Sequence, residues 1–151
     1  MSKPVKPIPE GYQSVIPYLV VDGAADLIEF LKTVFHAQEM MRMPAPGGKV
    51  GHTELRIGDC VVMLADAREQ WKPMQAMIYV YTEDCDAAYQ RAIQAGAASV
   101  REPRTEFYGD RSAGVTDRWG NQWWIGTHVE DVSEEEMKRR QQAAAGPSKG
   151  D

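Results

Sequence analysis

Polar and apolar residues alternate with a period of two through a strand-length segment in the first half of the chain. One face of that strand would carry His52, Glu54 and Arg56, and the other would carry Leu55 and Ile57. The apolar face is expected to pack against a helix. A base, an acid and a cation would then share the opposite face of a half-buried strand, which indicates a polar site.

The residues around this strand follow either strand or helix periodicity. Apolar residues at helical spacing predict a helix over residues 24–35, and Gly58-Asp59 predicts a tight hairpin between two strands. The predicted order is a strand at 15–21, the helix, an extended segment at 38–43, a loop at 44–48, and strands at 50–57 and 60–65.

The second half of the chain repeats this order about 62 residues later. A β-rich run at 77–81 precedes a helical stripe that Gly96 ends, and Gly120-Asn121 falls where Gly58-Asp59 did. One such module leaves a sheet face exposed, whereas two modules can cover each other or curl around a cavity. We therefore predict an α+β fold made of two βαβββ modules in one chain.

Composition divides the chain further. Proline and glycine dominate its start, Trp71 and Pro73 lie between the repeats, and Ser133 with Glu136 forms a capping box for a short helix at about 134–142. The predicted boundaries are an irregular arm at 1–11, a first module at 12–66, a linker at 67–74, a second module at 75–131, and the short helix with a tail at 132–151, disordered from residue 143.

Charge and cysteine content narrow the function. The net charge is −5 with scattered basic residues, so we expect no nucleic-acid partner. No apolar run approaches the roughly 20 residues that span a bilayer, and the first residues lack the core of a secretory signal, so we expect no membrane partner. Cys60 and Cys85 make no disulfide framework, although one bridge between them stays an alternative. A reduced, cytoplasmic protein is the simplest expectation.

Six segments occur in a recognisable order and spacing: Ile16–Val21, Val34–Ala37, His52–Asp59, Tyr108–Arg111, Asp117–Asn121 and Trp123–His128. Together they resemble the vicinal oxygen chelate superfamily, also called the glyoxalase/bleomycin-resistance/dioxygenase family, and are most similar to its PhnB-type subgroup. The resemblance covers about residues 12–131. It departs at two turns, where relatives often have Phe-Gly and Asp-Pro but this chain has Phe35-His36 and Asp117-Arg118.

The resemblance implies sheets that curl around a cavity, helices outside, and a protein that is often a homodimer. Metal-dependent members hold a divalent ion with four His, Gln or Glu side chains from the first and last strands of each module. Those positions here, give or take one, hold Ile16, Met63 or Val62, Met77 and Trp124. None is a ligand that such sites use, so the usual metal site is predicted to be absent and no cofactor is expected.

The polar strip is the leading candidate for chemistry. On a strand that lines the cavity, Arg56 would hold an anionic group and Glu54 or His52 would move a proton. The alternative is a solvated outer face, which is common in antiparallel sheets. Tyr18 would contact a ligand through its ring and hydroxyl. Trp124 would be a flat platform for the ligand, unless it fills the core.

Further candidates lie outside this strip. Tyr108 and Arg111 belong to a segment that would cover the cavity mouth, where Arg111 would bind a carboxylate or phosphate unless it forms a surface turn. His36 and His128 lie at element ends and are interpreted as structural or exposed. Ser112, Gly114 and Thr116 would leave room for a ligand or reflect tight strand packing, and Met40, Met41 and Met43 would form a dimer seam or a permissive ligand wall.

Three functions follow from these residues, because fold membership does not settle function. The first is a metal-independent protein that binds or converts a small, partly aromatic or anionic organic molecule in the sheet cavity. The second is a metal-dependent lyase, isomerase or dioxygenase with a relocated site that uses His52 and Glu54. The third is a non-catalytic interaction module with a filled cavity.

Overall fold

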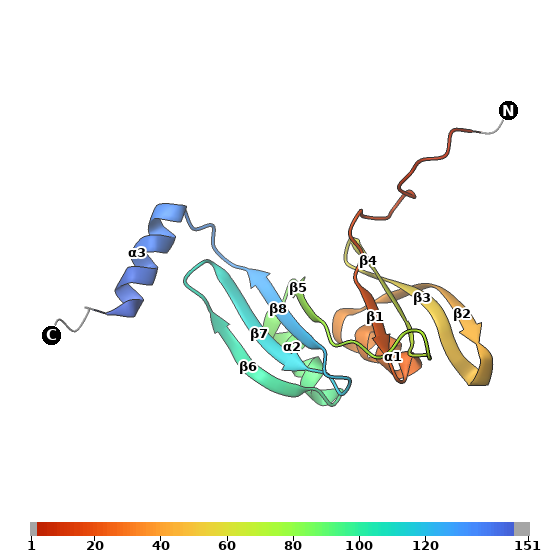
Figure 1. Cartoon of the computed structure of the whole chain (residues 1–151). Coiled ribbons are helices and arrows are strands. Elements are labelled where there is room, and N and C mark those ends of the chain that lie inside the picture. Colours follow the sequence, from red (N-terminus) through yellow and green to blue (C-terminus); the bar gives the residue numbers. More distant parts are fainter. Residues whose placement is uncertain (1–2, 147–151) are drawn as a thin grey trace. The chain divides into compact units, whose positions relative to one another are not determined.

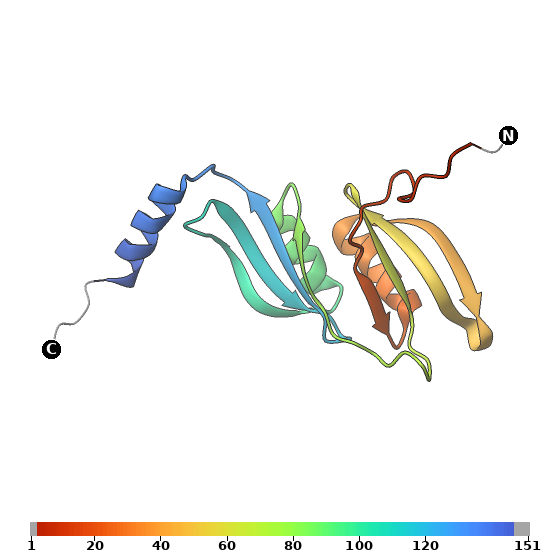
Figure 2. The same ribbon diagram turned by 45° about the horizontal axis from the view of Figure 1, so that its top comes forward.

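The computed structural model describes residues 3–146 and divides the chain into two compact units, residues 1–76 and 77–151. Each unit contains a four-stranded mixed sheet with a helix against one face (Figures 1 and 2). The predicted α+β fold of two βαβββ modules is confirmed. None of the described helices is long and apolar enough to cross a membrane.

The first unit follows the predicted order closely. Strand β1 (Tyr18–Val21) runs parallel to β4 (Cys60–Asp66), and the sheet order is β1-β4-β3-β2 with the other pairs antiparallel. The remaining elements are α1 (Ala24–Phe35), β2 (Gln38–Ala45), a short 3₁₀ turn (Pro46–Gly48) and β3 (Lys49–Ile57). The predicted loop at 44–48 is therefore shorter, since its first two residues continue β2.

Strand β1 begins three residues later than predicted because a side chain takes its place. The side-chain amide of Gln13 donates to the Val61 carbonyl at 2.6 Å and accepts from the Val61 N–H at 3.0 Å. These two backbone groups would otherwise pair with an earlier part of β1. Regular pairing starts after the Pro17 carbonyl accepts from the Met63 N–H at 3.0 Å.

The second unit repeats the arrangement. Tyr18 pairs with Met63 in the first sheet and Tyr79 pairs with Trp124 in the second, so these strands recur after 61 residues, close to the predicted offset. The sheet order is β5-β8-β7-β6. Its elements are β5 (Met77–Tyr81), α2 (Cys85–Gln94), β6 (Ala98–Thr105), β7 (Asp110–Thr116), β8 (Gln122–His128) and α3 (Glu134–Ala145).

The C-terminal helix extends beyond its predicted end. Ser133 accepts from the Glu136 N–H at 3.2 Å, which is the capping contact that the sequence predicts. Residues 143–145 are helical, contrary to the prediction of a disordered tail, because three alanines prolong the helix until Gly146. The rest of the predicted tail, residues 147–151, lies outside the described residues.

Helices α1 and α2 each cover one face of their own sheet, and we call the other face the open face. In the first unit α1 packs against β3 and β4, and Leu55 and Leu64 are fully buried. Since side chains alternate along a strand, His52, Glu54 and Arg56 lie on the open face. The predicted placement of the polar strip opposite the helix is correct, although Ile57 is only half-buried.

A polar side chain from the last strand of each sheet holds the start of α1 and of α2. The Asp66 carboxylate accepts the backbone N–H groups of Gly23, Ala24 and Val50 at 2.7 to 2.9 Å. In the second unit the Thr127 hydroxyl accepts the Cys85 N–H at 2.9 Å. These contacts satisfy donors that a helix N-terminus otherwise leaves unpaired.

Candidate functional site

A chain of hydrogen bonds runs across the open face of the first sheet. The Tyr18 hydroxyl on β1 lies 2.8 Å from Nδ1 of His52 on β3. Nε2 of the same imidazole lies 2.7 Å from Glu54 Oε2, and the Tyr12 hydroxyl donates to Glu54 Oε1. The structure thus brings together three predicted site residues, Tyr18, His52 and Glu54, and adds Tyr12. We call these four residues the relay.

The electrostatics of the relay favour an ionised Glu54. Glu54 is buried, with 7% of its surface exposed. The hydrogen bonds from Tyr12 and then His52 lower the pKa of Glu54, and they outweigh the opposing effect of burial. The same bond to Glu54 raises the pKa of Tyr12, and burial raises that of Tyr18. Glu54 is therefore a carboxylate that can accept a proton from the tyrosine side through His52.

The N-terminal arm, residues 7–16, lies over this face. A turn closed by the Tyr12 N–H and the Pro9 carbonyl at 3.1 Å places Gly11 at a φ of 84°, which glycine adopts without strain. Arg56 donates from Nη2 to the Gly11 carbonyl at 3.3 Å. The predicted anion-binding guanidinium is therefore engaged by the arm. The sequence did not mark Tyr12 as a site residue, because no pattern in an irregular segment indicates which strand the segment will contact.

Two hollows adjoin the relay. The first, which we call the aromatic hollow, has a volume of about 250 Å³, and Tyr18 forms part of its wall. The second, the arm hollow, has a volume of about 430 Å³ and lies between Glu54 and Met63 of the sheet and residues of the arm, Ile16 among them. Since Tyr18 lines one hollow and Glu54 the other, His52 connects them through hydrogen bonds.

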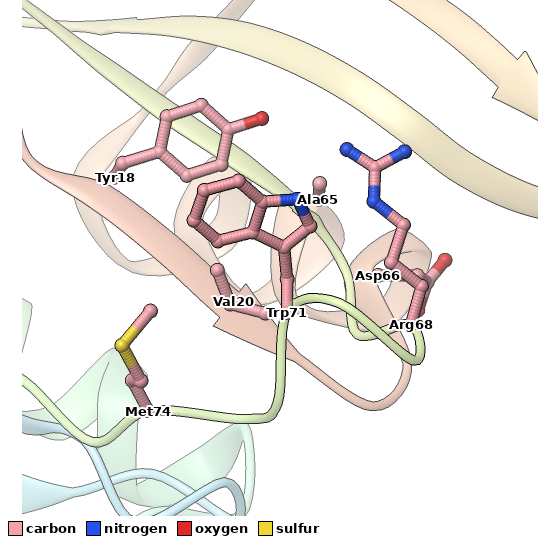
Figure 3. Close-up of a pocket in the computed structure, with 7 residues that line it drawn as sticks. All are labelled: Tyr18, Val20, Ala65, Asp66, Arg68, Trp71 and Met74. Carbon is pink, nitrogen blue, oxygen red and sulfur yellow. The ribbon is translucent and has the colours of Figure 1, made fainter.

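The aromatic hollow combines sheet and linker residues (Figure 3). A two-residue turn forms where the Arg68 and Trp71 backbones pair at 2.9 and 3.0 Å, and the Met74 N–H donates to the Val20 carbonyl at 3.1 Å. The full lining is Tyr18, Val20, Ala65, Asp66, Arg68, Trp71 and Met74. The sequence marked this stretch only as a linker, since its contacts depend on where the chain returns to β1.

The open face of the second sheet carries a different cluster. The buried Asp110 carboxylate accepts from the Tyr79 and Tyr81 hydroxyls at 2.8 Å each and lies 3.0 Å from His128 Nδ1. Burial opposes ionisation of Asp110, but the bonds from His128 and the tyrosines together lower its pKa. His128 is half-exposed, and this ion pair raises its pKa. The cluster escaped sequence analysis because its members are far apart along the chain.

Trp124 lies on the open face, as its alternation with the buried Trp123 predicts. Its indole lies over Gly114, where an added Cβ would be 2.9 Å from the ring. The Arg101 guanidinium stacks 5.1 Å from the ring centroid. The expectation that Gly114 leaves room for a ligand is wrong, because Trp124 fills that room.

Arg111 and Tyr108 do not gather at a common mouth. Arg111 makes two bonds to Asp86 of α2, at 2.6 and 2.8 Å, and so lies on the helix side of β7. Its expected role over the cavity is not supported, because alternation along β7 directs residue 111 away from the open face. Tyr108 lies in the β6–β7 turn, where its ring meets Phe107 edge to face at 5.3 Å.

The residues at the family's metal positions do not fit a divalent ion. Ile16 and Met63 line the arm hollow, and Met77 and Trp124 lie on the second sheet, so none offers a carboxylate, an imidazole or an amide oxygen. For a relocated site, His52 and Glu54 are bonded to each other. No group of three or more His, Cys, Asp or Glu residues that could hold a metal ion is found within residues 3–146.

The two cysteines are both free thiols, so the alternative of a Cys60–Cys85 bridge is wrong. Cys60 is exposed on β4, whereas Cys85 is buried at the start of α2. Burial raises the pKa of Cys85 to about 11, and burial is also the main cause that raises the pKa of Cys60. Neither thiol is activated as a nucleophile.

Comparison with known proteins places this geometry in a family. The model of the Glyoxalase/Bleomycin resistance protein/Dioxygenase superfamily matches residues 14–125. An uncharacterized protein of Mycobacterium bovis is 37% identical over 146 residues, which covers 89% of this chain and 93% of the relative. An uncharacterized protein of Mycobacterium tuberculosis strain H37Rv is also 37% identical, with 83% of the relative covered.

Solved structures share the fold. TioX from Micromonospora sp. ML1 has a TM-score of 0.65 and 24% identity, covering 78% of this chain and 99% of that one. The fosfomycin resistance protein FosX from Mesorhizobium loti has a TM-score of 0.57 and 20% identity, with coverages of 82% and 94%. From the match of the family model and the identity to its mycobacterial relatives, the chain belongs to the glyoxalase/bleomycin resistance protein/dioxygenase superfamily.

Proposed function

We propose that this protein binds a small organic molecule on the open face of its first sheet without using a metal ion. The observation that carries the proposal is the aromatic hollow of about 250 Å³ beside the relay. An apolar concave wall with a few polar groups at its rim is the usual form of a small-molecule site. The apolar residues at the family's metal positions support metal independence.

The relay supplies a means of converting the ligand as well as binding it. The Tyr18 hydroxyl lies at the hollow and can take a proton from a bound molecule as its own proton moves to Nδ1 of His52 and the Nε2 proton of His52 moves to the ionised Glu54. Burial raises the pKa of Tyr18, so its hydroxyl stays protonated near neutral pH and donates to Nδ1 of His52. In this proposal Tyr18, His52 and Glu54 have the direct roles and Tyr12 orients Glu54.

The comparisons support a small-molecule role of this kind. One similar structure is named a fosfomycin resistance protein, and another, from Nocardioides, is named a glyoxalase/bleomycin resistance protein/dioxygenase. We extend the proposal to a cytoplasmic homodimer of the PhnB-type subgroup. The exposed Met40 and Met43 of β2, at an edge of the first sheet, support a subunit contact there.

A matched pair of substitutions tests where the ligand binds. Ala65→Leu would fill the floor of the aromatic hollow, and Ala98→Leu adds the same atoms to an exposed position of β6. A panel of small organic compounds is screened by thermal shift and ligand-observed NMR. We expect compounds that stabilise the wild-type protein and the Ala98→Leu variant but not Ala65→Leu. Binders that survive Ala65→Leu, or an absence of binders, would contradict the proposal.

Elemental analysis separates this proposal from a metal-dependent enzyme. Protein purified without chelator is expected to contain no stoichiometric divalent metal, and EDTA should leave ligand binding unchanged. One equivalent of metal that disappears in a His52→Ala/Glu54→Ala variant would instead support the relocated metal site. The interaction-module alternative is disfavoured by the two hollows, since it requires a filled face.

A further inference from the structure

The aromatic hollow has a cation at its rim that the protein itself does not neutralise. Arg68 lines the hollow, and no carboxylate within residues 3–146 forms an ion pair with it. Other arginines of the first unit are engaged: Arg42 bonds to Glu39 at 2.5 Å and Arg56 bonds to the arm. An unpaired guanidinium beside an apolar wall has the geometry to bind a planar anion.

The acid that also borders this hollow does not cancel the charge of Arg68. Asp66 uses both carboxylate oxygens to accept backbone N–H groups at the start of α1 and β3. These donors outweigh burial and lower the pKa of Asp66. The negative charge of Asp66 is therefore stabilised by three backbone N–H groups, and the guanidinium of Arg68 stays available to a ligand.

The walls of the hollow are suited to an aromatic ring. Figure 3 shows the Tyr18 ring, the Trp71 indole and the Arg68 guanidinium, which all line the hollow. Trp71 is 53% exposed and Tyr18 45% exposed, so both retain ring surface that a ligand can cover. Aromatic side chains pack most favourably against another aromatic ring in offset-stacked or edge-to-face contact.

From these observations we propose that the hollow binds a single-ring aromatic carboxylate, with the ring against Tyr18 and Trp71 and the carboxylate on Arg68. The proposal rests on the proposed function and names the ligand class of the same site. Size supports one ring, since an apolar cavity of roughly 150 Å³ already holds benzene and this hollow offers about 250 Å³. The Tyr18 ring then contacts the ligand while the bond to His52 holds the Tyr18 hydroxyl in place.

Two probes of nearly equal shape test the charge. Benzoate and benzamide differ in the anionic group, and cyclohexanecarboxylate keeps the charge without the aromatic ring. Binding is measured by isothermal titration calorimetry and by the shift of the tryptophan indole N–H signals in ¹⁵N-labelled protein. We expect benzoate to bind at least about tenfold more tightly than benzamide, because hydrogen bonds to a charged group contribute more. Cyclohexanecarboxylate should fall between them.

Variants assign the effect to residues. Arg68→Gln should bring the affinities for benzoate and benzamide together, whereas Arg104→Gln, which removes an exposed guanidinium of the second unit, should leave the preference intact. Trp71→Leu should weaken both probes by a similar factor. The far-ultraviolet circular dichroism of each variant checks that it is folded.

The outcomes distinguish this inference from the function on which it rests. Equal affinities for benzoate and benzamide in the wild-type protein, or a preference that survives Arg68→Gln, would overturn the aromatic-acid assignment alone. So would binding of another compound class that Ala65→Leu abolishes while benzoate fails to bind. If no compound binds the wild-type protein at millimolar concentration, the proposed function falls together with this inference.

Discussion

The open faces of the two sheets share a fold but differ in what occupies them. In the first sheet Glu54 pairs with Met63, and hollows adjoin both strands. In the second sheet the corresponding pair is Gly114 and Trp124, and the indole lies over the glycine. One face presents polar groups beside open volume, while the other is covered by its own aromatic side chains.

This difference shows how a duplicated module can divide its tasks. In the second sheet, aromatic rings occupy the space beside glycines. The Tyr79 hydroxyl, for example, lies where a Cβ at Gly126 would be. Tyr79 is then held by Asp110, and Trp124 by Arg101. The first sheet has Glu54 and Ala65 at the equivalent positions and no large ring over them, which leaves space on that face. We infer that the second unit stabilises the fold while the first carries the chemistry.

The largest expected effect comes from adding a side chain at Gly126, where the Tyr79 ring already fills the space. An added Cβ at Gly126 would lie 2.1 Å from the Tyr79 hydroxyl, whereas at Gly51 in the first sheet the nearest atom is at 3.3 Å. We expect Gly126→Ala to lower the free energy of unfolding by about 2–3 kcal/mol and Gly51→Ala to cost less than about 1 kcal/mol. Urea unfolding measures both.

A second substitution shows whether Tyr79 causes this loss. In a Tyr79→Ala background the space beside Gly126 is empty. The Gly126→Ala substitution should then lower the free energy of unfolding much less than in the wild-type protein. If the cost of Gly126→Ala is the same in both backgrounds, or no greater than that of Gly51→Ala, the two faces do not differ in the way described.

The residues that follow α1 and α2 allow a reciprocal pair of substitutions. His36 after α1 adopts a left-handed φ of 55°, while α2 is followed by Gly96 at a φ of 100°. Because a side chain in this region costs roughly 1 kcal/mol, we expect His36→Gly to raise the unfolding free energy by up to about 1 kcal/mol and Gly96→His to lower it by about 1 kcal/mol. His36→Ala, which keeps the Cβ, should give no gain in thermal unfolding experiments.

The relay of the first sheet can be probed through Glu54. Tyr12→Phe removes the main cause that lowers the pKa of Glu54, so that pKa should rise toward its ordinary value of 4.5. A group with a lowered folded pKa adds stability above its unfolded pKa and loses it as the pH falls through the folded value. The variant should therefore lose less stability on acidification. Carboxyl ¹³C NMR titration measures the pKa, with Tyr18→Phe as control, and an unchanged value would argue against the Tyr12 contact.

The smallest expected effect concerns His128 at the second face. Its bonds to Asp110 and then Asp131 raise its pKa above the ordinary value of 6.5. A raised pKa adds stability that is complete below pH 6.5 and disappears as the pH rises through the folded value. The stability advantage of wild type over His128→Gln should thus shrink above pH 6.5 in thermal unfolding. Asp131→Asn should keep part of that trend, and a pH-independent advantage would refute this role.

Local signals in the sequence were enough to predict the order of the elements. Helix α1 has the predicted bounds, and the Gly58-Asp59 hairpin joins β3 and β4. The face that His52 and Glu54 share also followed from alternation, since period two is a property of any strand. Alternation likewise predicted that Trp123 and Trp124 lie on opposite faces of their strand.

Longer-range contacts were beyond the reach of that reasoning. Tyr12, Arg68 and Trp71 enter the site from segments without periodicity, and Arg111 finds its partner in Asp86 of α2, a contact that no local pattern indicates. Alternation states which face a residue occupies but not which neighbour fills the space beside it. That is why Gly114 and Trp124 looked like a ligand platform before their mutual packing was known.

The amino-acid order by itself therefore established two βαβββ modules and the side of the sheet on which the acid and base lie. Periodicity encodes these features within a few residues of chain. Folding in three dimensions decided that the first face stays hollow and the second is filled, and it brought the arm and the linker to the relay. Those contacts join residues more than forty positions apart, and their energies depend on side-chain volumes meeting in space.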